Sequence, residues 1–268
     1  MRILPALVVL ATLAGCETVA TTQPGAVGIE RQQSMMVSSA EIDKAAAQEY
    51  RKVILQAQQK RTRDRNAQHV QRVRTIVNRM IPHTGALRAD APRWAWEAHV
   101  IQENQLNAWA MPGGKMVVYS GLIEKLQLTD NELAAIMGHE IAHSLREHAR
   151  ERVSREMATG LGVGIAGALL GLGDMAQSVA GMVANVTFNL PHSRTHEIEA
   201  DRIGVELAAR AGYDPRAAVT LWQKMQQASG GGPPELLSTH PAPQNRIEDL
   251  KMYSEKVVPL YQAARARR

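Results

Sequence analysis

Hydrophobic residues recur at intervals of three and four between residues 40 and 80, a stretch that contains neither Pro nor Gly. The clearest examples are Val70, Val73, Val77 and Met80. This spacing places apolar side chains on one face of a helix, so the stretch predicts one or two long helices. The polar face is basic, because nine Lys or Arg and one acid, Asp64, lie between Arg51 and Arg79. Such a face is either simply solvated or lies against an anionic lipid surface.

A period of two replaces the helical spacing beyond Pro92. The alternating residues are Trp94, Trp96, Ala98 and Val100. This alternation predicts a strand. Two further short strands are expected at residues 107–111 and 116–119, with the turn Pro112-Gly113-Gly114 between them. The three strands together predict a small sheet.

A buried helix is expected after this sheet. Thr129 and Glu132 have the spacing of a capping box, so a helix should begin there and run towards Met157. Residues 133–142 are apolar on nearly every side of that helix, which is typical of a helix inside the core. The elements predict an α+β fold that is mainly α, with a small antiparallel or mixed sheet beside the buried helix.

Three polar residues interrupt the buried helix: His139, Glu140 and His143, in the order His-Glu-Ile-Ala-His. An unpaired buried imidazole or carboxylate costs a few kcal/mol, so these side chains need partners. Residues four apart share a helix face, so both imidazoles can bind one metal ion while Glu140 reaches a water beside it. This is the HExxH pattern of zincins, with Glu140 as general base. The alternative is a pair of core histidines with ordinary hydrogen-bond partners.

A catalytic zinc site needs a third protein ligand and an open position for water. The zincin class with a His six residues after the second ligand is excluded, because that residue is Ala149. Glu197 and Asp201 lie four apart at the start of an amphipathic helix. We expect Glu197 to be the ligand and Asp201 to accept a hydrogen bond from a ligating imidazole. A solvated acidic first helical turn explains these carboxylates equally well on their own.

Composition fits a globular protein and narrows the chemistry of the site. Apolar residues make up 45% of the chain, and a net charge of +5 is too small to indicate nucleic-acid binding. The lone cysteine, Cys16, excludes an internal disulfide framework and any Cys-rich zinc site. A metal must therefore be held by His and carboxylate side chains.

The amino terminus predicts export. Arg2 precedes a mostly apolar run at residues 3–14, which has the length of a signal peptide and is too short to span a bilayer. The run ends in Leu-Ala-Gly-Cys16, which resembles the lipobox of bacterial lipoproteins. Residues 1–15 would then be the signal peptide and Cys16 the lipidated residue. The alternative is an ordinary secretory signal with an incidental Cys.

The segment after Cys16 shapes the expected location. Residues 16–39 are rich in Thr, Gln, Gly and Ser without periodicity, so they predict a flexible tether between lipid and fold. Glu17, rather than Asp, follows the Cys, which favours the outer over the inner membrane. The expected location is the periplasmic face of a bacterial cell envelope.

Four motifs carry a family resemblance. They are Asn107-Ala-Trp-Ala-Met-Pro-Gly-Gly114, His139-Glu-Ile-Ala-His143, Ser193-Arg-x-x-Glu197-x-x-x-Asp201 and Ser238-Thr-His240-Pro-x-x-x-x-Arg246. In this order they resemble the HtpX and CaaX prenyl protease family of zinc metallopeptidases, peptidase family forty-eight. The resemblance spans about residues 87–250. With the lipobox, the chain is most similar to the periplasmic lipoprotein branch, which is related to the mitochondrial Oma protease.

The resemblance implies a zinc metalloendopeptidase of the gluzincin type with one Zn²⁺ per chain. It places His139, His143 and Glu197 on the metal, and His240 and Arg246 in the cleft, where they would stabilise the oxyanion. The expected substrates are unfolded or misassembled envelope proteins, with the outer-membrane assembly machinery as a candidate partner. An extended substrate would pair with an edge strand. That strand is formed by Asn107, Ala108, Trp109 and Ala110.

The expected organisation is a basic helical region at residues 40–82, a protease domain at 83–262 and a basic tail at 263–268. Residues 159–190 are Gly-rich and apolar but contain Asp174, which makes them a poor membrane span. They predict a helical hairpin that covers the zinc cleft as a lid, or plain core packing. The rival function is a chaperone-like lipoprotein that assists outer-membrane protein assembly, with latent or minor protease activity.

Overall fold

The computed structural model describes residues 17–169, 175–228, 235–241 and 245–267. Its strands are β1 (Glu17–Val19), β2 (Gln33–Met35), β3 (Glu97–Ile101), β4 (Ala108–Met111) and β5 (Lys115–Tyr119). The longer helices are α1 (Ser39–Gln59), α2 (Ala67–Thr84), α4 (Asp130–Leu145), α5 (His148–Leu169), α6 (Met175–Phe188), α7 (Arg194–Arg210), α8 (Ala217–Gln227) and α10 (Arg246–Ala266). Shorter helical turns are η1 (Ala91–Arg93), α3 (Ser120–Lys125) and α9 (Glu235–Thr239). The mainly helical fold with a small sheet confirms the predicted fold class.

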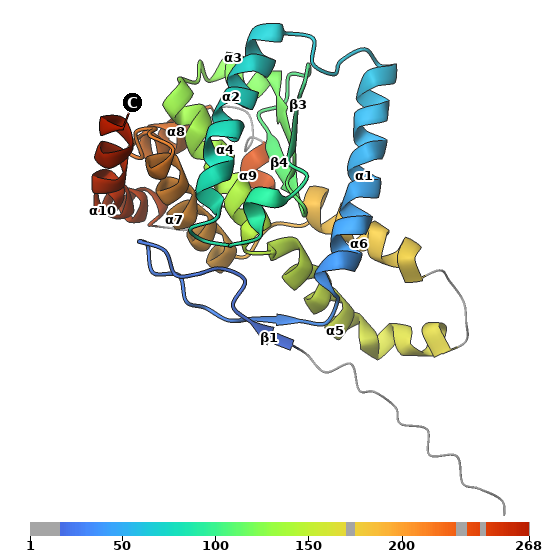
Figure 1. The fold of residues 1–268 in the computed structure, drawn as a ribbon. Coiled ribbons are helices and arrows are strands. Elements are labelled where there is room, and N and C mark those ends of the chain that lie inside the picture. Colours follow the sequence, from blue (N-terminus) through green and yellow to red (C-terminus); the bar gives the residue numbers. More distant parts are fainter. Residues whose placement is uncertain (1–16, 170–174, 229–234, 242–244, 268) are drawn as a thin grey trace, which may run out of the picture.

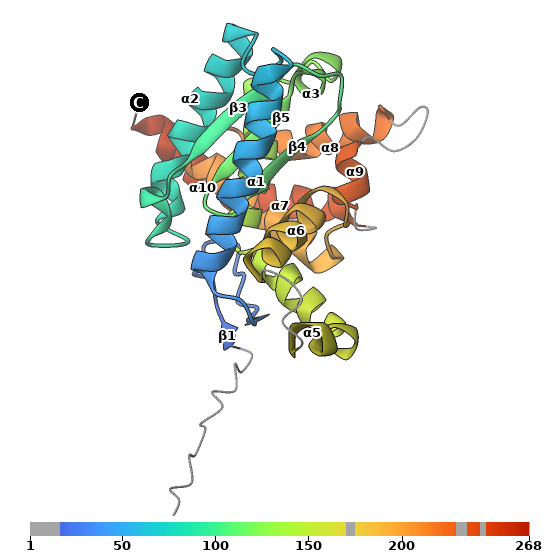
Figure 2. The same ribbon diagram turned by 90° about the vertical axis from the view of Figure 1, so that its right-hand side faces the viewer.

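The central sheet has the strand order β3-β5-β4 and separates two hydrophobic layers. β3 is parallel to β5 and β4 is antiparallel to it, so the sheet is mixed. Helix α1 covers one face, and α2 and α4 lie on the other (Figures 1 and 2). Side chains alternate between the layers, as Met116 and Val118 of β5 join the α2 and α4 side while Val117 joins the α1 side. One edge of β4 is left without a strand partner among the described residues.

Helix α4 begins as the sequence predicts and ends earlier. Thr129 and Glu132 form the capping box, in which each side chain binds the backbone N–H of the other residue. The helix ends at Leu145 instead of continuing towards Met157, because Glu147 adopts a φ of +49° and α5 starts at His148 in a new direction. The prediction of one continuous helix was wrong, and the break brings the side chains of Arg146 and His148 into the core.

Helices α4 and α7 touch through their backbones. A Cβ atom at Gly138 would lie 2.7 Å from the carbonyl oxygen of Gly204, and one at Gly204 would lie 2.8 Å from the backbone nitrogen of His139. Only glycine permits this distance, so the two helices cross at the turn that carries the HExxH residues. The crossing sets the position of α7 relative to His139.

The segment predicted as a flexible tether packs against the body. Residues 17–38, called the N-terminal strap from here on, contain the antiparallel pair β1 and β2 and run past α5 and α7 (Figure 1). Val27, Ile29 and Met35 are buried, and the backbone N–H of Val27 donates to the buried carboxylate of Glu206. The apolar residues lie at period two within a polar stretch, which hid them from a composition-based prediction. Cys16 and the predicted signal peptide lie outside the described residues.

Other boundaries also differ from the predicted ones. The first strand starts at Glu97, because Trp94 and Trp96 follow the turn η1 and stack on each other instead of pairing. The basic region at residues 40–82 forms two helices as expected, but α2 packs into the same core as α4 and is no separate unit. The segment at 159–190 is seen as the packed helices α5 and α6, and a lid role for it stays a prediction. Among the described residues, no helix is both long and apolar enough to span a membrane.

Candidate metal centre

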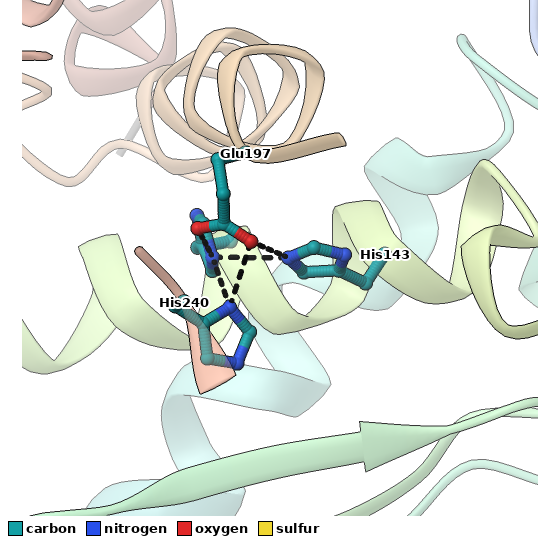
Figure 3. A group of neighbouring side chains, drawn as sticks. His143, Glu197 and His240 are labelled. Carbon is teal, nitrogen blue, oxygen red and sulfur yellow. Dashed lines mark hydrogen bonds and ion pairs between the residues drawn. The ribbon is translucent and has the colours of Figure 1, made fainter. Parts of the chain in front are cut away.

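Four side chains from three parts of the chain converge at the end of α4 (Figure 3). His139 and His143 come from α4, Glu197 from the first turn of α7, and His240 from the residue after α9. One donor atom from each lies within 4.8 Å of all the others, and all four side chains are buried. The structure thus brings together the three predicted ligands and places His240 beside them as a possible fourth donor. The oxyanion role expected of His240 stays a prediction.

The donor spacing fits a zinc ion. Nε2 of His139 lies 3.1 Å from Nε2 of His143 and 3.2 Å from Nδ1 of His240, and Glu197 Oε1 lies 3.5 Å from His143 Nε2. Zinc–ligand distances of about 2.0–2.1 Å at tetrahedral angles place neighbouring donors about 3.3 Å apart. Imidazole and carboxylate donors also suit zinc chemically. The residues present therefore fit the metal that the sequence predicts.

The protonation states of the metal-free protein favour metal binding. Burial lowers the pKa of His143 well below its ordinary value, so this imidazole is neutral, which is the form that binds a cation. Burial opposes ionisation of Glu197, but the charge of His240 and hydrogen bonds from His143 and His240 hold its pKa well below the usual range. The centre thus offers neutral imidazole nitrogen and an ionised carboxylate, the forms that bind a cation.

Asp201 and Arg246 contact the ligands His139 and Glu197 and fix their orientation. Nδ1 of His139 lies 2.9 Å from Oδ1 of Asp201, where the sequence analysis expected a hydrogen bond. Nη2 of Arg246 donates to Asp201 Oδ1 at 2.7 Å and to Glu197 Oε2 at 3.2 Å, and its guanidinium lies 3.3 Å from the ring centroid of Trp222. Arg246 therefore positions two carboxylates, and the oxyanion role predicted for it stays a prediction.

Glu140 is placed to exchange protons beside the donors. Its Oε1 is buried without a hydrogen-bond partner among the described residues and lies 3.6 Å from Nε2 of His240. Burial raises the pKa of Glu140, although the nearby His240 and His139 oppose this, and a raised pKa suits a carboxylate that both takes up and releases a proton. Glu140 can therefore accept a proton from an attacking water and return it to the leaving amine. A zinc ion at the centre would supply a Lewis acid that polarises the scissile carbonyl.

The predicted substrate strand lies beside this carboxylate. The backbone N–H of Ala110 in β4 donates a hydrogen bond to Glu140, so the edge strand runs directly past the general base. Ala108 and Trp109 bury their side chains in the body, while Asn107 and Ala110 are partly exposed. The main chain of β4, more than its side chains, is therefore available to an extended peptide.

A further histidine packs against two of the donors. The ring of His192, from the loop between α6 and α7, lies 4.1 Å from the ring centroid of His143 and 4.8 Å from that of His240. The backbone N–H of His192 donates to the carbonyl of Thr239 at 2.8 Å, which ties this loop to the end of α9. His240 is 3% exposed and the other donor side chains are also buried, so the centre is closed in this structure.

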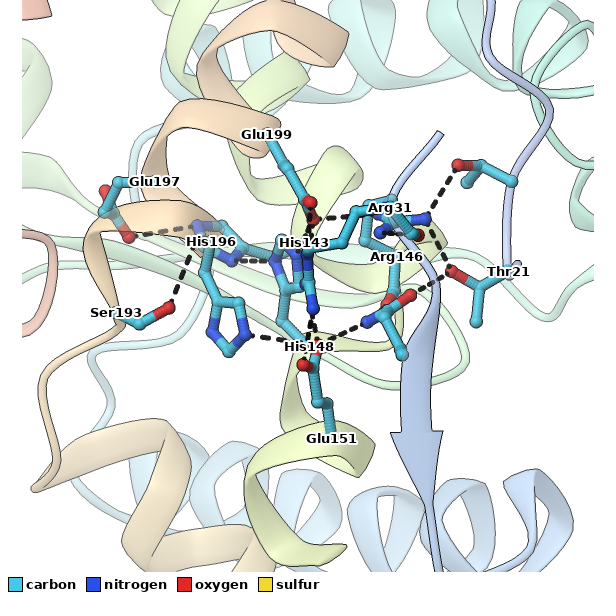
Figure 4. Close-up of polar contacts among 12 residues, drawn as sticks. Thr21, Arg31, His143, Arg146, His148, Glu151, Ser193, His196, Glu197 and Glu199 are labelled. Atoms are coloured by element: carbon cyan, nitrogen blue, oxygen red, sulfur yellow. Dashed lines mark hydrogen bonds and ion pairs between the residues drawn. The ribbon is translucent and has the colours of Figure 1, made fainter. Parts of the chain in front are cut away.

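Sequence reasoning missed a polar cluster next to His143, which is buried except for the partly exposed Arg31 (Figure 4). Its members are Arg31, Arg146, His148, Glu151, His196 and Glu199. The only signal in the sequence was the density of His and acidic residues around the HExxH and Glu197 motifs. Arg31 lies more than a hundred residues away in the N-terminal strap, so its membership was visible only in the fold.

The fold and the centre define a metallopeptidase of the HExxH type, with two histidines on one buried helix and a glutamate on the next. Residues 67–254 match the model of peptidase family M48, so the chain belongs to that family of peptidases. This confirms the family and the enzyme class expected from the motifs. Membership implies a divalent metal at the centre.

Several proteins of known name are similar to this chain. Mitochondrial metalloendopeptidase OMA1 of Schizosaccharomyces pombe is 37% identical over 158 residues, which cover 58% of this chain and 46% of the relative. The OMA1 metalloendopeptidase of Bos taurus is 38% identical over 167 residues, covering 58% of this chain and 32% of the relative. The beta-barrel assembly-enhancing protease of Escherichia coli is 32% identical over 204 residues, covering 71% and 40%. The matched region thus spans less than half of each relative.

Proposed function

We propose that this metalloendopeptidase uses zinc to hydrolyse unfolded or misassembled proteins of a bacterial cell envelope, as part of protein quality control. The observation that carries the proposal is the edge strand β4 beside Glu140. A substrate that pairs with this strand must offer several residues of extended backbone. Unfolded chains present such backbone, whereas folded domains keep theirs in hydrogen bonds.

The predicted anchor supports the location. Cys16 immediately precedes β1 and follows a run that resembles a lipobox, so a lipid on Cys16 would hold the peptidase domain at the periplasmic face of a membrane, with the outer membrane favoured. Among the similar proteins is a beta-barrel assembly-enhancing protease, a name that supports barrel proteins or their assembly machinery as partners. Replacing Cys16 with Ser should move the protein from the membrane fraction to the soluble fraction of the envelope.

A second candidate function is a chaperone-like lipoprotein that assists outer-membrane protein assembly and cleaves little. The observation in its favour is the closed centre, in which His240 lies among the metal donors and His192 packs against two of them. A barrel-assembly assay in cells distinguishes the two functions through Glu140→Gln, which removes the general base and leaves all metal donors. Loss of function in this variant supports proteolysis. Full function in this variant supports the chaperone-like role and contradicts our proposal.

A further inference from the structure

The metal ligand His143 is hydrogen-bonded on its far side to a second histidine. Nε2 of His143 faces the other donors, and its Nδ1 lies 2.9 Å from Nδ1 of His148. Nε2 of His148 lies 3.0 Å from Oε2 of Glu199. Both outer residues are buried, with His148 at 0% and Glu199 at 4% exposure, so no solvent competes for these hydrogen bonds.

The positions of the protons follow from this chain of contacts. A metal bound at Nε2 of His143 requires the proton of that ring to be on Nδ1, which must then donate to His148. Nδ1 of His148 is therefore the acceptor, and the proton of His148 lies on Nε2. Glu199 is a carboxylate and can only accept, so it fits the end of this relay. With a metal at Nε2 of His143 and a neutral His148, the contacts permit this one assignment of protons.

Two arginines fix the end of the relay (Figure 4). Nε of Arg146 donates to Oε2 of Glu199 at 3.0 Å, and Arg31 of the N-terminal strap donates to both oxygens of the same carboxylate, at 2.5 and 3.1 Å. The guanidinium of Arg31 also makes a two-point pair with Glu151 at 2.7 and 2.9 Å. The strap thus contributes a charge that holds Glu199 in the orientation that receives His148.

We propose that His148, Glu199 and Arg31 are positioning residues for the metal centre, through which the docked N-terminal strap sets the tautomer and orientation of the ligand His143. The other imidazole ligand, His139, is positioned directly by a carboxylate, because its Nδ1 contacts Asp201. His143 is instead positioned by the ring of His148, which binds Glu199, which in turn binds Arg31 of the strap. Undocking the strap therefore weakens metal binding without touching any ligand.

The stacking of His196 on His148 supports this role. The two ring centroids are 4.2 Å apart with planes 15° from parallel, and Nε2 of His196 lies 3.2 Å from Oε2 of Glu151. His196 therefore fixes the plane of the His148 ring, and His196 is itself held by Glu151, the carboxylate that Arg31 binds. The cluster is rigid enough to orient a ligand.

Replacement of His148 tests the relay through zinc affinity, measured by competition with a chelator. His148→Asn keeps an acceptor near the position of Nδ1, whereas His148→Leu fills the site and accepts nothing. Loss of such a hydrogen-bond partner typically lowers metal affinity by about 10–100-fold. We expect a loss of this size in the Leu variant and recovery of most of the affinity in the Asn variant. Equal affinities in both variants would overturn the relay.

The contribution of the strap is tested with two arginines that both bind the strap to the body through a carboxylate. Arg31→Gln removes the pairs with Glu199 and Glu151. Arg150→Gln removes an arginine that donates to the strap carbonyl of Val37 and to the carboxylate of Glu147. Only Arg31 is connected to His143. We expect a zinc affinity about tenfold lower in the Arg31 variant and unchanged in the Arg150 variant. Equal losses would show that the strap acts only through stability.

A third readout needs no substitution. In the zinc-loaded protein, ¹⁵N NMR of the histidine rings should show His148 neutral, with its proton on Nε2. A proton on Nδ1 would overturn the proposal even if the Leu variant does not fold. The proposal rests on metal binding at the four-donor group, which is measured separately. Failure of the wild-type protein to bind zinc would overturn the metal assignment and this proposal together, whereas tight zinc binding with unchanged variants would overturn the relay alone.

Discussion

Arg246 should be a main contributor to the stability of the metal-free protein. Its side chain is 1% exposed and donates to Glu197 and Asp201, whose side chains are 0% and 4% exposed. Replacement by Gln removes the arginine that bridges these two buried carboxylates. Removing one partner of a buried ion pair costs about 3–5 kcal/mol. A domain of ordinary stability has about 5–15 kcal/mol in total, so this is a large fraction.

Arg202 is a matched control on the same pair of helices. It lies on α7 and makes a two-point pair with Asp249 of α10 at 2.6 and 2.9 Å, and it lies over the ring of Tyr253 as Arg246 lies over Trp222. The Arg202 pair is partly solvated, with exposures of 25% and 18%. Partly solvated pairs contribute about 1 kcal/mol or less. Arg202 and Arg246 therefore have the same charge and side chain and connect the same two helices, and the burial of their ion pairs is the main difference between them.

The assay is equilibrium unfolding in urea at pH 7 with a chelator present. We expect Arg246→Gln to lower the free energy of unfolding by at least about 2 kcal/mol more than Arg202→Gln does. The slope of the transition should stay the same in both variants, because the surface exposed on unfolding does not change. Equal losses in the two variants would refute the reasoning that burial of the Glu197 and Asp201 carboxylates makes Arg246 essential.

Three further outcomes are expected. His240→Ala should retain about one zinc per chain, because three donors remain. It should also raise the rate of hydrolysis of a short peptide, because a coordination position opens for water. Loss of hydrolysis with zinc retained would instead support the oxyanion role of His240. Gly204→Ala forces a Cβ to within 2.8 Å of the backbone nitrogen of His139, so thermal denaturation should show a loss of about 1–3 kcal/mol, and unchanged stability would contradict the close crossing. The folded-state pKa of Glu197 lies below its unfolded value of about 4.3, so its stabilisation is present above that pH and disappears as pH falls through the folded pKa. The free energy of unfolding of the metal-free protein should therefore fall less steeply with decreasing pH in Glu197→Gln than in the wild type. Identical pH profiles would contradict this role of Glu197.

The metal ligands were accessible from sequence because their geometry is local. His139 and His143 share a helix face by their spacing alone, and the apolar run around them shows that the face is buried. Helix spacing alone could not identify Glu197 as a ligand, because Glu197 lies on a different helix whose position relative to α4 is set by the fold. The resemblance to a family supplied that step, and the backbone contact between Gly138 and Gly204 is its physical cause.

The features missed by the sequence analysis depend on tertiary contacts. The end of α4 at Leu145 follows from the positive φ of Glu147, and no Gly or Pro marks that position. The N-terminal strap has the composition of a linker, yet Arg31 reaches two buried carboxylates that lie far along the chain. Such pairs carry no periodic signal, so neither composition nor spacing could reveal that the strap binds the buried carboxylates Glu151 and Glu199.

The central claim is that Glu140 performs proton transfer in a zinc peptidase. The direct test is degradation of unfolded casein by a soluble form of the chain that begins at Glu17, run beside its Glu140→Gln variant with zinc content measured in both. We predict one zinc per chain in each protein, and cleavage by the wild-type protein only. Equal cleavage by both proteins, or none by either with zinc bound, would contradict this account of the centre.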